Sequence, residues 1–241
     1  ERENLKVLTE SYSHTILVIN VGGHIDMGFL DEIPGIDAVV LFVQGGEEGG
    51  NALADVLSGK LNFSGKLADT IPMRYEDIPF GDEFSYLNGD VRNEYYKEDI
   101  YVGYRYFDSF HKAVRYPFGF GLTYGDIVCT SVEYKDGSAV VSAENKGKNA
   151  TEDVIELYIK DYSENAVTNV SLCGFKRISL DAGEKVTVTI PVPERAFTAV
   201  DEKGERKRFG SRFTLYAGTH QPDAISETLC GNKCAVTEIN L

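Results

Sequence analysis

The chain has 241 residues, of which 42% are hydrophobic and 26% are charged. This length is enough for one large domain or two modest ones, each able to bury a core. Lys and Arg total 24 against 38 Asp and Glu, which gives a net charge of −14. Because so acidic a surface repels phosphate backbones and anionic lipids, we expect neither nucleic acid nor a membrane among the partners.

The opening part of the chain alternates between helical and strand patterns. Two continuous apolar runs, TILVIN at 15–20 and DAVVLFV at 37–43, are typical of strands that are covered on both faces. Helical patterns precede, separate and follow them at 4–12, 25–33 and about 48–57. This alternating order predicts a parallel sheet between layers of helices.

The predicted parallel sheet is short of strands. A pair of strands cannot make a stable covered sheet, so we expect the first domain to need strands from outside this chain. The sequence opens on ERENLKVL, without an initiator Met and without a charged-then-apolar leader. Either a leader has been removed or the chain is a piece of something longer, and the unfinished sheet favours the second explanation.

The rest of the chain changes character twice. Residues 72–124 are dense in Tyr, Phe, Gly and Asp without a sustained period, which indicates a strap packed on neighbouring domains. Short alternating segments follow, with turn signals such as Asp136-Gly137 between them. The strands that we expect lie at 127–134, 138–145, 152–161, 171–180, 184–192 and 211–218. Their spacing predicts an antiparallel β-sandwich of about seven strands.

The cysteines are the remaining compositional clue. They are Cys129, Cys173, Cys230 and Cys234, all in the second half of the chain. They are too sparse for a disulfide scaffold, and no second Cys or His pair completes a zinc site with Cys230 and Cys234. We therefore expect reduced structural thiols, no metal and no cofactor.

Four blocks of sequence carry a resemblance to a known family. They are QGGEEGGNALADVLSGKLNFSGKLADTIP, then YVGYRYFD with YPFGFGLTYGDI, then IELYIKD, then LCGFKRISLDAGEKVTVTIPV. Together they resemble the carboxyl-terminal half of the family 3 glycoside hydrolases, which are β-glucosidases, β-xylosidases and exo-glucanases. Phe63 stands where the family usually has Pro, and FGFGLTY replaces the commoner FGYGLSY. Neither departure touches a residue type that the chemistry requires.

The resemblance implies a three-part enzyme of which this chain holds the later parts. The family begins with a TIM-like barrel that carries a nucleophilic Asp, followed by a flavodoxin-like α/β sandwich that carries an acid/base Glu. A retaining glycosidase needs both carboxylates, about 5–5.5 Å apart. Nothing in this sequence matches the segments that carry them, so we assign no catalytic residue to the chain.

The expected fold class is therefore α/β plus all-β. A partial flavodoxin-like α/β sandwich is expected at 1–71, an aromatic-rich strap at 72–125 and a fibronectin type III-like β-sandwich at 126–241. The flavodoxin-like and fibronectin-like names come from the resemblance.

The stretch VQGGEEGGNALADVLSG breaks a strand sharply into a helix at a glycine-rich corner. Such corners often cradle phosphate, but Glu47 and Glu48 would repel an anion and no P-loop lysine follows. The plainer interpretation is a tight corner whose carboxylates favourably face the helix dipole. A third interpretation is a sugar cleft, because open α/β sheets bind ligands at the carboxyl ends of their strands. On that interpretation the cleft candidates are Gln44, Glu47, Glu48 and His24.

Two other charged stretches have two interpretations each. Glu98 and Asp99 lie among tyrosines, where they would serve either a sugar subsite or, as we favour, packing between domains. The basic run at 202–210 is either a solvated turn, which we favour, or a docking patch for an acidic partner.

The function that we expect is the non-barrel portion of a retaining exo-β-glycosidase. It would act on a β-glycoside substrate, releasing terminal glucose or xylose, with a companion chain or fragment that carries the TIM-like barrel. The alternative is a non-catalytic module that binds carbohydrate or protein. Homo-oligomerisation stays open, and we expect a soluble protein, cytoplasmic rather than secreted.

Overall fold

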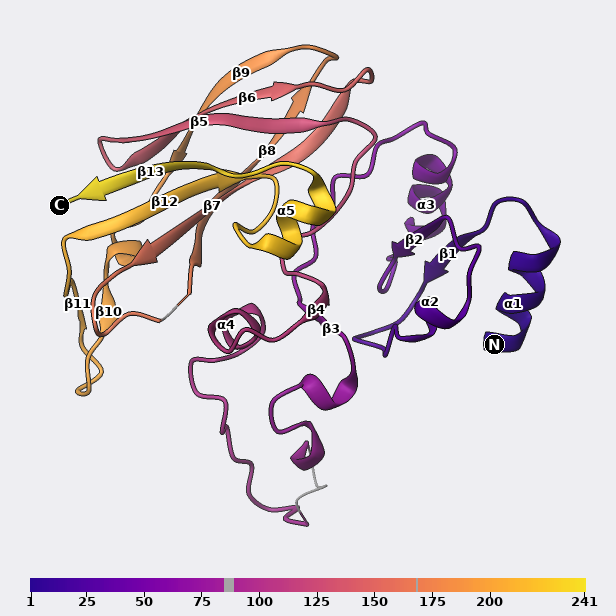
Figure 1. Ribbon diagram of the computed structural model, residues 1–241, viewed down its shortest axis with the longest axis horizontal. Helices are drawn as coiled ribbons and strands as arrows, with labels where there is room; N and C mark the ends of the chain where they lie inside the picture. Colours follow the sequence, from indigo (N-terminus) through magenta and orange to yellow (C-terminus); the bar gives the residue numbers. More distant parts are fainter. Residues whose placement is uncertain (85–88, 168) are drawn as a thin grey trace. The chain divides into compact units, whose positions relative to one another are not determined.

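A computed structural model describes residues 1–84, 89–167 and 169–241 (Figure 1). The chain divides into two compact units. The first unit comprises Glu1–Leu61 and Ile71–Glu94, and the second comprises Asn62–Thr70 and Tyr95–Leu241. The chain thus joins the second unit at 62–70, returns to the first unit at 71–94, and stays in the second unit from residue 95 onward.

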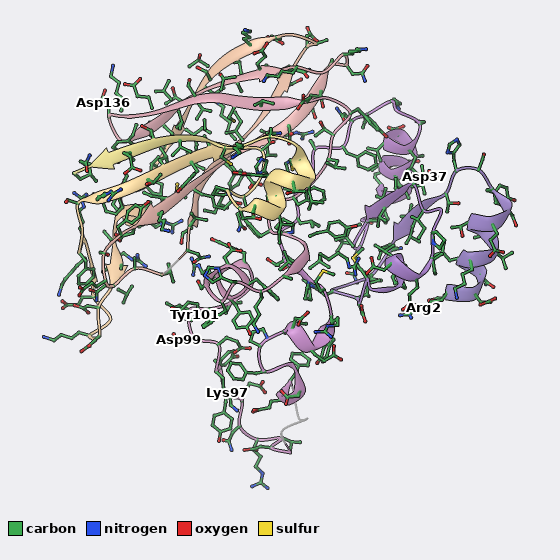
Figure 2. All side chains as sticks on the ribbon, viewed as in Figure 1. Arg2, Asp37, Lys97, Asp99, Tyr101 and Asp136 are labelled. Carbon is green, nitrogen blue, oxygen red and sulfur yellow. The ribbon has the colours of Figure 1, made fainter. Side chains whose placement is uncertain are left out.

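The first unit has the α/β order that the sequence predicts. Strands β1 (Ile16–Ile19) and β2 (Ala38–Leu41) are parallel, in a register that pairs Ile16 with Ala38 and Ile19 with Leu41. The start of the pair is fixed by Asp37, labelled in Figure 2, whose carboxylate accepts a hydrogen bond from the Thr15 N–H at 2.8 Å. The helices of this unit are α1 (Arg2–Ser11), α2 (Phe29–Glu32) and α3 (Gly49–Leu57).

The described part of this unit leaves apolar side chains of β1 and β2 exposed to solvent. The side chains of Ile16 and Leu41 are 52% and 36% exposed, and none of the residues of α1, α2 and α3 is buried. The buried apolar side chains among this unit's described residues are Ile19, Met27, Ile33 and Ile71. A core this small cannot offset the conformational entropy of ordering so many residues.

The segment predicted as a strap contains short elements. In the first unit they are β3 (Ile71–Pro72) and the 3₁₀ turns η1 (Tyr75–Asp77) and η2 (Gly81–Glu83). In the second unit they are α4 (Tyr104–Ser109) and β4 (Val114–Tyr116). No helix in the described ranges is long and apolar enough to cross a bilayer.

The second unit contains the β-sandwich, which confirms the all-β prediction. Among its described residues one sheet has the order β13-β12-β7-β8, and the other has the order β5-β6-β9. The predicted strands are β5 (Ile127–Lys135), β6 (Ser138–Asn145), β7 (Thr151–Asp161), β8 (Ser171–Leu180), β9 (Lys185–Pro191) and β12 (Arg212–Gly218). Elements that the sequence patterns did not predict are β10 (Ala199–Val200), β11 (Arg206–Lys207), η4 (Glu194–Phe197), α5 (Ala224–Cys230) and β13 (Ala235–Asn240).

The core of the sandwich lies between these two sheets. Strand β6 alternates between half-buried and buried positions along its whole length, as the period of a half-covered strand requires. The ring of Phe197 packs edge-on against those of Tyr134 and Phe213, with centroids 5.4 and 5.1 Å away. Phe213 and Leu215 are fully buried, and each such side chain contributes roughly 1.5–3 kcal/mol of burial.

Two turns show why the strands pair in this register. Asp136 and Gly137 both have positive φ, at 48° and 76°, so they form the two-residue hairpin turn that Asp-Gly favours between β5 and β6. At the far end of β6, the buried Asn145 amide donates to the carbonyl oxygens of Asn149, Leu180 and Asp181. This side chain ties the turn after β6 to the end of β8.

Candidate functional site

The carboxyl edge of the parallel pair lies in the first unit, where the chain leaves β1 and β2. Parallel strands end on the same edge of a sheet, so the two following loops are neighbours. They touch, because a Cβ on Gly22 would lie 2.8 Å from the Gln44 Nε2 atom. The glycine after β1 therefore leaves room for the amide after β2.

The glycine-rich corner packs against the ring of Phe42. A Cβ on Gly45 would overlap the Phe42 ring, and a Cβ on Gly49 would lie 3.0 Å from it. The Gly49 N–H donates to the Gly46 carbonyl at 2.9 Å, which closes the turn at the start of α3. Tight packing thus accounts for Gly45 and Gly49, in agreement with the plainer interpretation of the motif.

The backbone is strained where the corner begins. Val43 has φ of +56°, a conformation that is unfavourable for a β-branched side chain. Strain of this kind persists only where the surrounding structure imposes it, and it clusters at binding sites. Val43 directly precedes Gln44, whose amide lies against Gly22.

All four cleft candidates are exposed at or beside this edge. Gln44, Glu47 and Glu48 lie in the corner, and His24 lies in the loop after β1. Glu48 accepts a hydrogen bond from the Asn51 amide at 2.5 Å, within the start of α3. Exposed acceptors at the carboxyl end of parallel strands suit hydroxyl-rich ligands, but their role stays a prediction.

The Glu98–Asp99 pair lies in a loop of the second unit. Figure 2 labels Lys97, Asp99 and Tyr101 there. Asp99 is exposed with φ of +52°, and the Tyr101 N–H donates to the Glu98 carbonyl at 2.9 Å. The Tyr101 ring packs edge-on against Phe110, at 5.1 Å between centroids. The loop is thus a turn with aromatic packing behind it within the second unit, and packing between domains stays a prediction.

The basic run at 202–210 has local partners for its charges. The Lys207 amine lies 2.8 Å from Asp201 and 2.6 Å from Glu205, and Arg208 lies 3.6 Å from Glu194. Lys207 itself is part of the β10–β11 hairpin. These contacts support a solvated turn rather than a docking patch.

A buried polar cluster in the second unit escaped the sequence analysis. Lys66 Nζ lies 2.8 Å from Asp153 Oδ1, with both side chains less than a tenth exposed, at 9% and 7%. Nearby on β7, the Tyr158 hydroxyl donates to Glu156 Oε2 at 2.6 Å, and both residues are buried. Charged residues are almost never this buried unless they are paired.

Burial perturbs the carboxyls of this cluster. It raises the pKa of Glu156 to about 7, which outweighs the lowering effects of the Tyr158 hydroxyl and the Lys66 charge. It also raises the pKa of Asp153, even though the Lys66 amine opposes the shift. One ammonium thus faces two carboxyls that are both reluctant to ionise.

A third, partly buried carboxyl lies on α4. Burial, together with the like charge of Asp223, raises the pKa of Asp108 to about 6. Its Oδ2 atom accepts hydrogen bonds from the Gln221 and Asn169 amides, which oppose the shift. Asp108 therefore links α4 to the segments that follow β12 and precede β8.

All four cysteines are free thiols, and Cys129, Cys230 and Cys234 lie close to this polar region. Burial raises the pKa of Cys129 and Cys173 to about 12, and that of Cys230 to about 11. Burial also raises the pKa of Cys234, whose thiol donates to the His220 carbonyl at 3.4 Å. Protonated thiols are poor nucleophiles and poor ligands, which fits the structural role predicted from sequence. The described residues contain no group of His, Cys, Asp and Glu that could hold a metal ion.

The family models match both parts of the chain. Residues 1–124 match the glycosyl hydrolase family 3 C-terminal domain. Residues 153–221 match a fibronectin type III-like domain. The order of the two matches agrees with the expected fold class, whereas the exact boundaries at 71 and 125 stay predictions.

Individual relatives agree with the family models. A β-glucosidase of Ruminococcus albus is 37% identical over 233 residues, which is 91% of this chain and 24% of the relative. An exo-α-(1→6)-L-arabinopyranosidase of Bifidobacterium breve is 36% identical over 191 residues, 76% of this chain and 25% of that enzyme.

Solved structures agree as well. A Bifidobacterium adolescentis GH3 β-glucosidase superposes with a TM-score of 0.81 at 30% identity, over 100% of this chain and 35% of that one. A Kluyveromyces marxianus β-glucosidase gives 0.84 at 27% identity, over 100% and 28% of the two chains.

The chain spans about a quarter of the length of the relatives named first, at 24% and 25%. The matches cover the family's C-terminal domain and the fibronectin-like domain that follows it. The chain therefore belongs to glycosyl hydrolase family 3 and corresponds to the C-terminal part of its β-glucosidases.

Proposed function

We propose that this chain is the non-barrel portion of a retaining exo-β-glycosidase that releases terminal β-linked glucose or xylose. A TIM-like barrel, carried by a companion chain, a fragment or the same longer polypeptide, would supply the catalytic carboxylates. The first unit would form one wall of the active-site cleft, and the sandwich would brace it.

The observation that carries the proposal is the uncovered parallel pair. Strands β1 and β2 have apolar side chains that the described part of the unit leaves half-exposed, while the relatives are about four times longer. Apolar strand faces are stable only when covered, so further protein is needed on this unit.

The buried carboxyls of the second unit do not suit glycoside hydrolysis. A catalytic pair must flank a sugar in an open cleft. Asp153 is committed to Lys66, and Glu156 is 4% exposed beneath the residues that cover it. Both lie in one strand of a packed sandwich, so we assign them no part in the reaction.

The first unit offers the residues that would meet a substrate. Gln44, Glu47, Glu48 and His24 are exposed at the carboxyl edge of the parallel pair. We propose that Gln44, next to the strained Val43, reaches the cleft and binds sugar hydroxyls. The amide both donates and accepts, which matches a hydroxyl group.

Activity assays test the proposal at the level of the whole chain. The pure chain should not hydrolyse nitrophenyl β-glucoside, β-xyloside or α-L-arabinopyranoside, whereas the chain joined to a family 3 barrel should hydrolyse at least one. Turnover by the pure chain would contradict the proposal. A pure chain that behaves as a monodisperse, stably folded monomer and binds sugar would favour the binding-module alternative.

A kinetic comparison tests the cleft residues. In the barrel-containing enzyme, Gln44→Ala should raise KM roughly tenfold, as expected for the loss of one sugar hydrogen bond worth about 1–1.5 kcal/mol. Glu10→Gln, an exposed change on α1, is the matched control and should leave KM unchanged. Equal kinetics for Gln44→Ala and the control would remove Gln44 from the cleft.

A further inference from the structure

Two segments that are far apart in sequence pair with each other within the second unit. The Leu67 N–H donates to the Phe120 carbonyl at 2.9 Å, and the Gly119 N–H donates to the Leu67 carbonyl at 2.8 Å. The Lys66 amine adds a hydrogen bond to the Gly121 carbonyl at 2.9 Å. We call residues 65–67 and 119–121 the clasp.

The clasp lies directly on the buried polar groups of β7. Lys66 of the clasp forms an ion pair with Asp153, and the backbone of Gly119 lies close to the Glu156 carboxyl. A Cβ on Gly119 would overlap the Glu156 Oε2 atom and would lie 2.8 Å from the Tyr158 hydroxyl. Gly119 also has φ of +76°, so a glycine is required there on two grounds. The carboxyl of Glu156 is therefore sealed by the clasp itself.

The closed clasp stabilises the neutral form of Glu156 more than the ionised form. The hydrogen-bond donor that the described residues give it is the neutral hydroxyl of Tyr158. The Lys66 amine is already engaged by Asp153 and by the Gly121 carbonyl. A neutral carboxylic acid is accommodated at a position that is 4% exposed, whereas an ionised one must share the charge of Lys66 with Asp153.

Other titratable groups face this site from each element packed around it. Around Glu156, the like charge of Asp153 adds to burial in raising the pKa, whereas the Tyr158 hydroxyl and the Lys66 charge lower it. The titratable groups are Lys66 of the clasp, Asp153 and Tyr158 of β7, Cys129 of β5, Tyr104 of α4, Asp223 at the N-cap of α5, Glu227 and Cys230 of α5, Cys234 before β13 and His220 after β12. Among them, the Lys66 amine is shared between Asp153 and the Gly121 carbonyl.

We propose that the clasp is a proton-sensitive latch, which stays closed on the sandwich while Glu156 carries a proton and opens more readily once Glu156 is ionised. Opening would expose Glu156 and Lys66 to water, which restores the hydration that the ionised carboxylate lacks. The closed and open states differ in the pairing of residues 65–67 with 119–121, not in the sandwich core.

The direction of the pH effect follows from the cluster. Burial raises the pKa of Glu156 from its ordinary 4.5 to about 7 in the closed state. A raised carboxyl pKa means that its contribution to closure is complete below about pH 4.5 and is lost as the pH rises through 7. The open fraction should therefore increase about 30-fold between pH 5.5 and 8.5.

Amide hydrogen exchange measures this opening on the full chain. Peptides that cover 62–70 and 117–122 report the N–H groups of Leu67 and Gly119, after correction for the intrinsic pH dependence of exchange. Their protection should fall by about the same 30-fold between pH 5.5 and 8.5, while protection in β6 stays constant. A flat profile in the clasp peptides would overturn the proposal.

Matched variants assign the effect to Glu156. Glu156→Gln keeps the shape and the acceptor for Tyr158 but cannot ionise, so clasp protection should vary less than about threefold over the same range. Glu133→Gln, an exposed change on β5, should keep the wild-type slope. Should Glu156→Gln fail to fold, Tyr158→Phe serves instead and should steepen the slope, because it removes the donor to the ionised form.

One further variant distinguishes an effect of Glu156 from an effect of the carboxyl of Asp108. Asp108→Asn should leave the slope of the clasp peptides in place, since Asp108 lies on α4 and pairs with Gln221. If Asp108→Asn flattens the slope and Glu156→Gln does not, the latch does not depend on Glu156 and the proposal fails.

Discussion

The two units of this chain differ in how much of their apolar sequence they bury for themselves. The sandwich closes a core between its two sheets, with Phe213 and Leu215 fully covered. The α/β unit has strands that are just as apolar, yet Ile16 is 52% exposed and no residue of its three described helices is buried. Similar hydrophobicity thus yields a self-sufficient fold in one region and a partly assembled one in the other.

The comparison teaches what apolar patterning can and cannot decide. It decides the type of element, because continuous and alternating runs give covered and half-covered strands respectively. It does not decide whether the cover comes from the same chain. In the α/β unit the described residues leave part of the apolar pattern uncovered.

The largest expected effect is in the sandwich core. Phe213→Ala should lower the free energy of unfolding of the second unit by about 3–5 kcal/mol, through lost burial and a new cavity. Ile16→Ala, the matched truncation in the other unit, should cost less than about 1 kcal/mol in this chain. Denaturant unfolding followed by a probe in each unit provides the measurement. Comparable losses at both positions would break the contrast between the units.

The next largest effect is expected at the buried ion pair. Lys66→Met keeps the aliphatic stem but leaves Asp153 and Glu156 buried without their ammonium, at a cost of about 3–5 kcal/mol. Lys185→Met removes an exposed pair with Glu144 and should cost less than about 1 kcal/mol. Equal thermal unfolding midpoints for the two variants would show that burial does not matter at Lys66.

A pH-dependent effect of intermediate size is expected at Asp108. Its raised pKa, about 6 against an ordinary 3.8, means that its contribution is complete below about pH 3.8 and is lost as the pH rises through 6. Between pH 4 and 7 the free energy of unfolding of the wild type should therefore fall relative to that of Asp108→Asn, by up to about 3 kcal/mol. Asp136→Asn, in an exposed turn that suits either residue, should follow the wild type. A constant difference across this range would contradict the assignment.

The smallest effect is expected at a surface pair of the sandwich. Arg177 on β8 pairs with Glu152 on β7, and both side chains are largely exposed. Arg177→Ala should change the free energy of unfolding by less than about 1 kcal/mol, and less again in high salt. A loss as large as that at Lys66 would indicate that this pair is shielded from solvent.

Much of the fold could be predicted from local sequence. The strands of the sandwich follow from alternation, and the β5–β6 turn follows from Asp136-Gly137. Helix α5 was missed although local signals exist: Asp223 caps it by accepting from two backbone N–H groups, and Gly231 ends it with φ of +71°. Strand β13 was missed because its short stretch has no turn-bounded partner nearby in sequence.

The candidate sites were predictable to different degrees. The carboxyl edge of the parallel pair follows from strand order, so Gln44 and His24 could be proposed without coordinates. The Lys66–Asp153 pair could not, since 87 positions separate residues 66 and 153 and tertiary folding brings them together. The one local hint was that two acidic residues, Asp153 and Glu156, flank Val154 and Ile155 in the predicted strand EDVIELYIKD.

The interleaved course of the chain has a consequence for how the protein can be divided. Because Asn62–Thr70 belongs with the sandwich while Ile71–Glu94 does not, no single cut separates the two units. A recombinant sandwich that starts at residue 126 would lack Lys66 and would inherit an orphaned Asp153. Limited proteolysis should accordingly release a sandwich that retains a short, non-covalently held peptide from near residue 66, and dissection of the natural protein should keep that peptide or replace it.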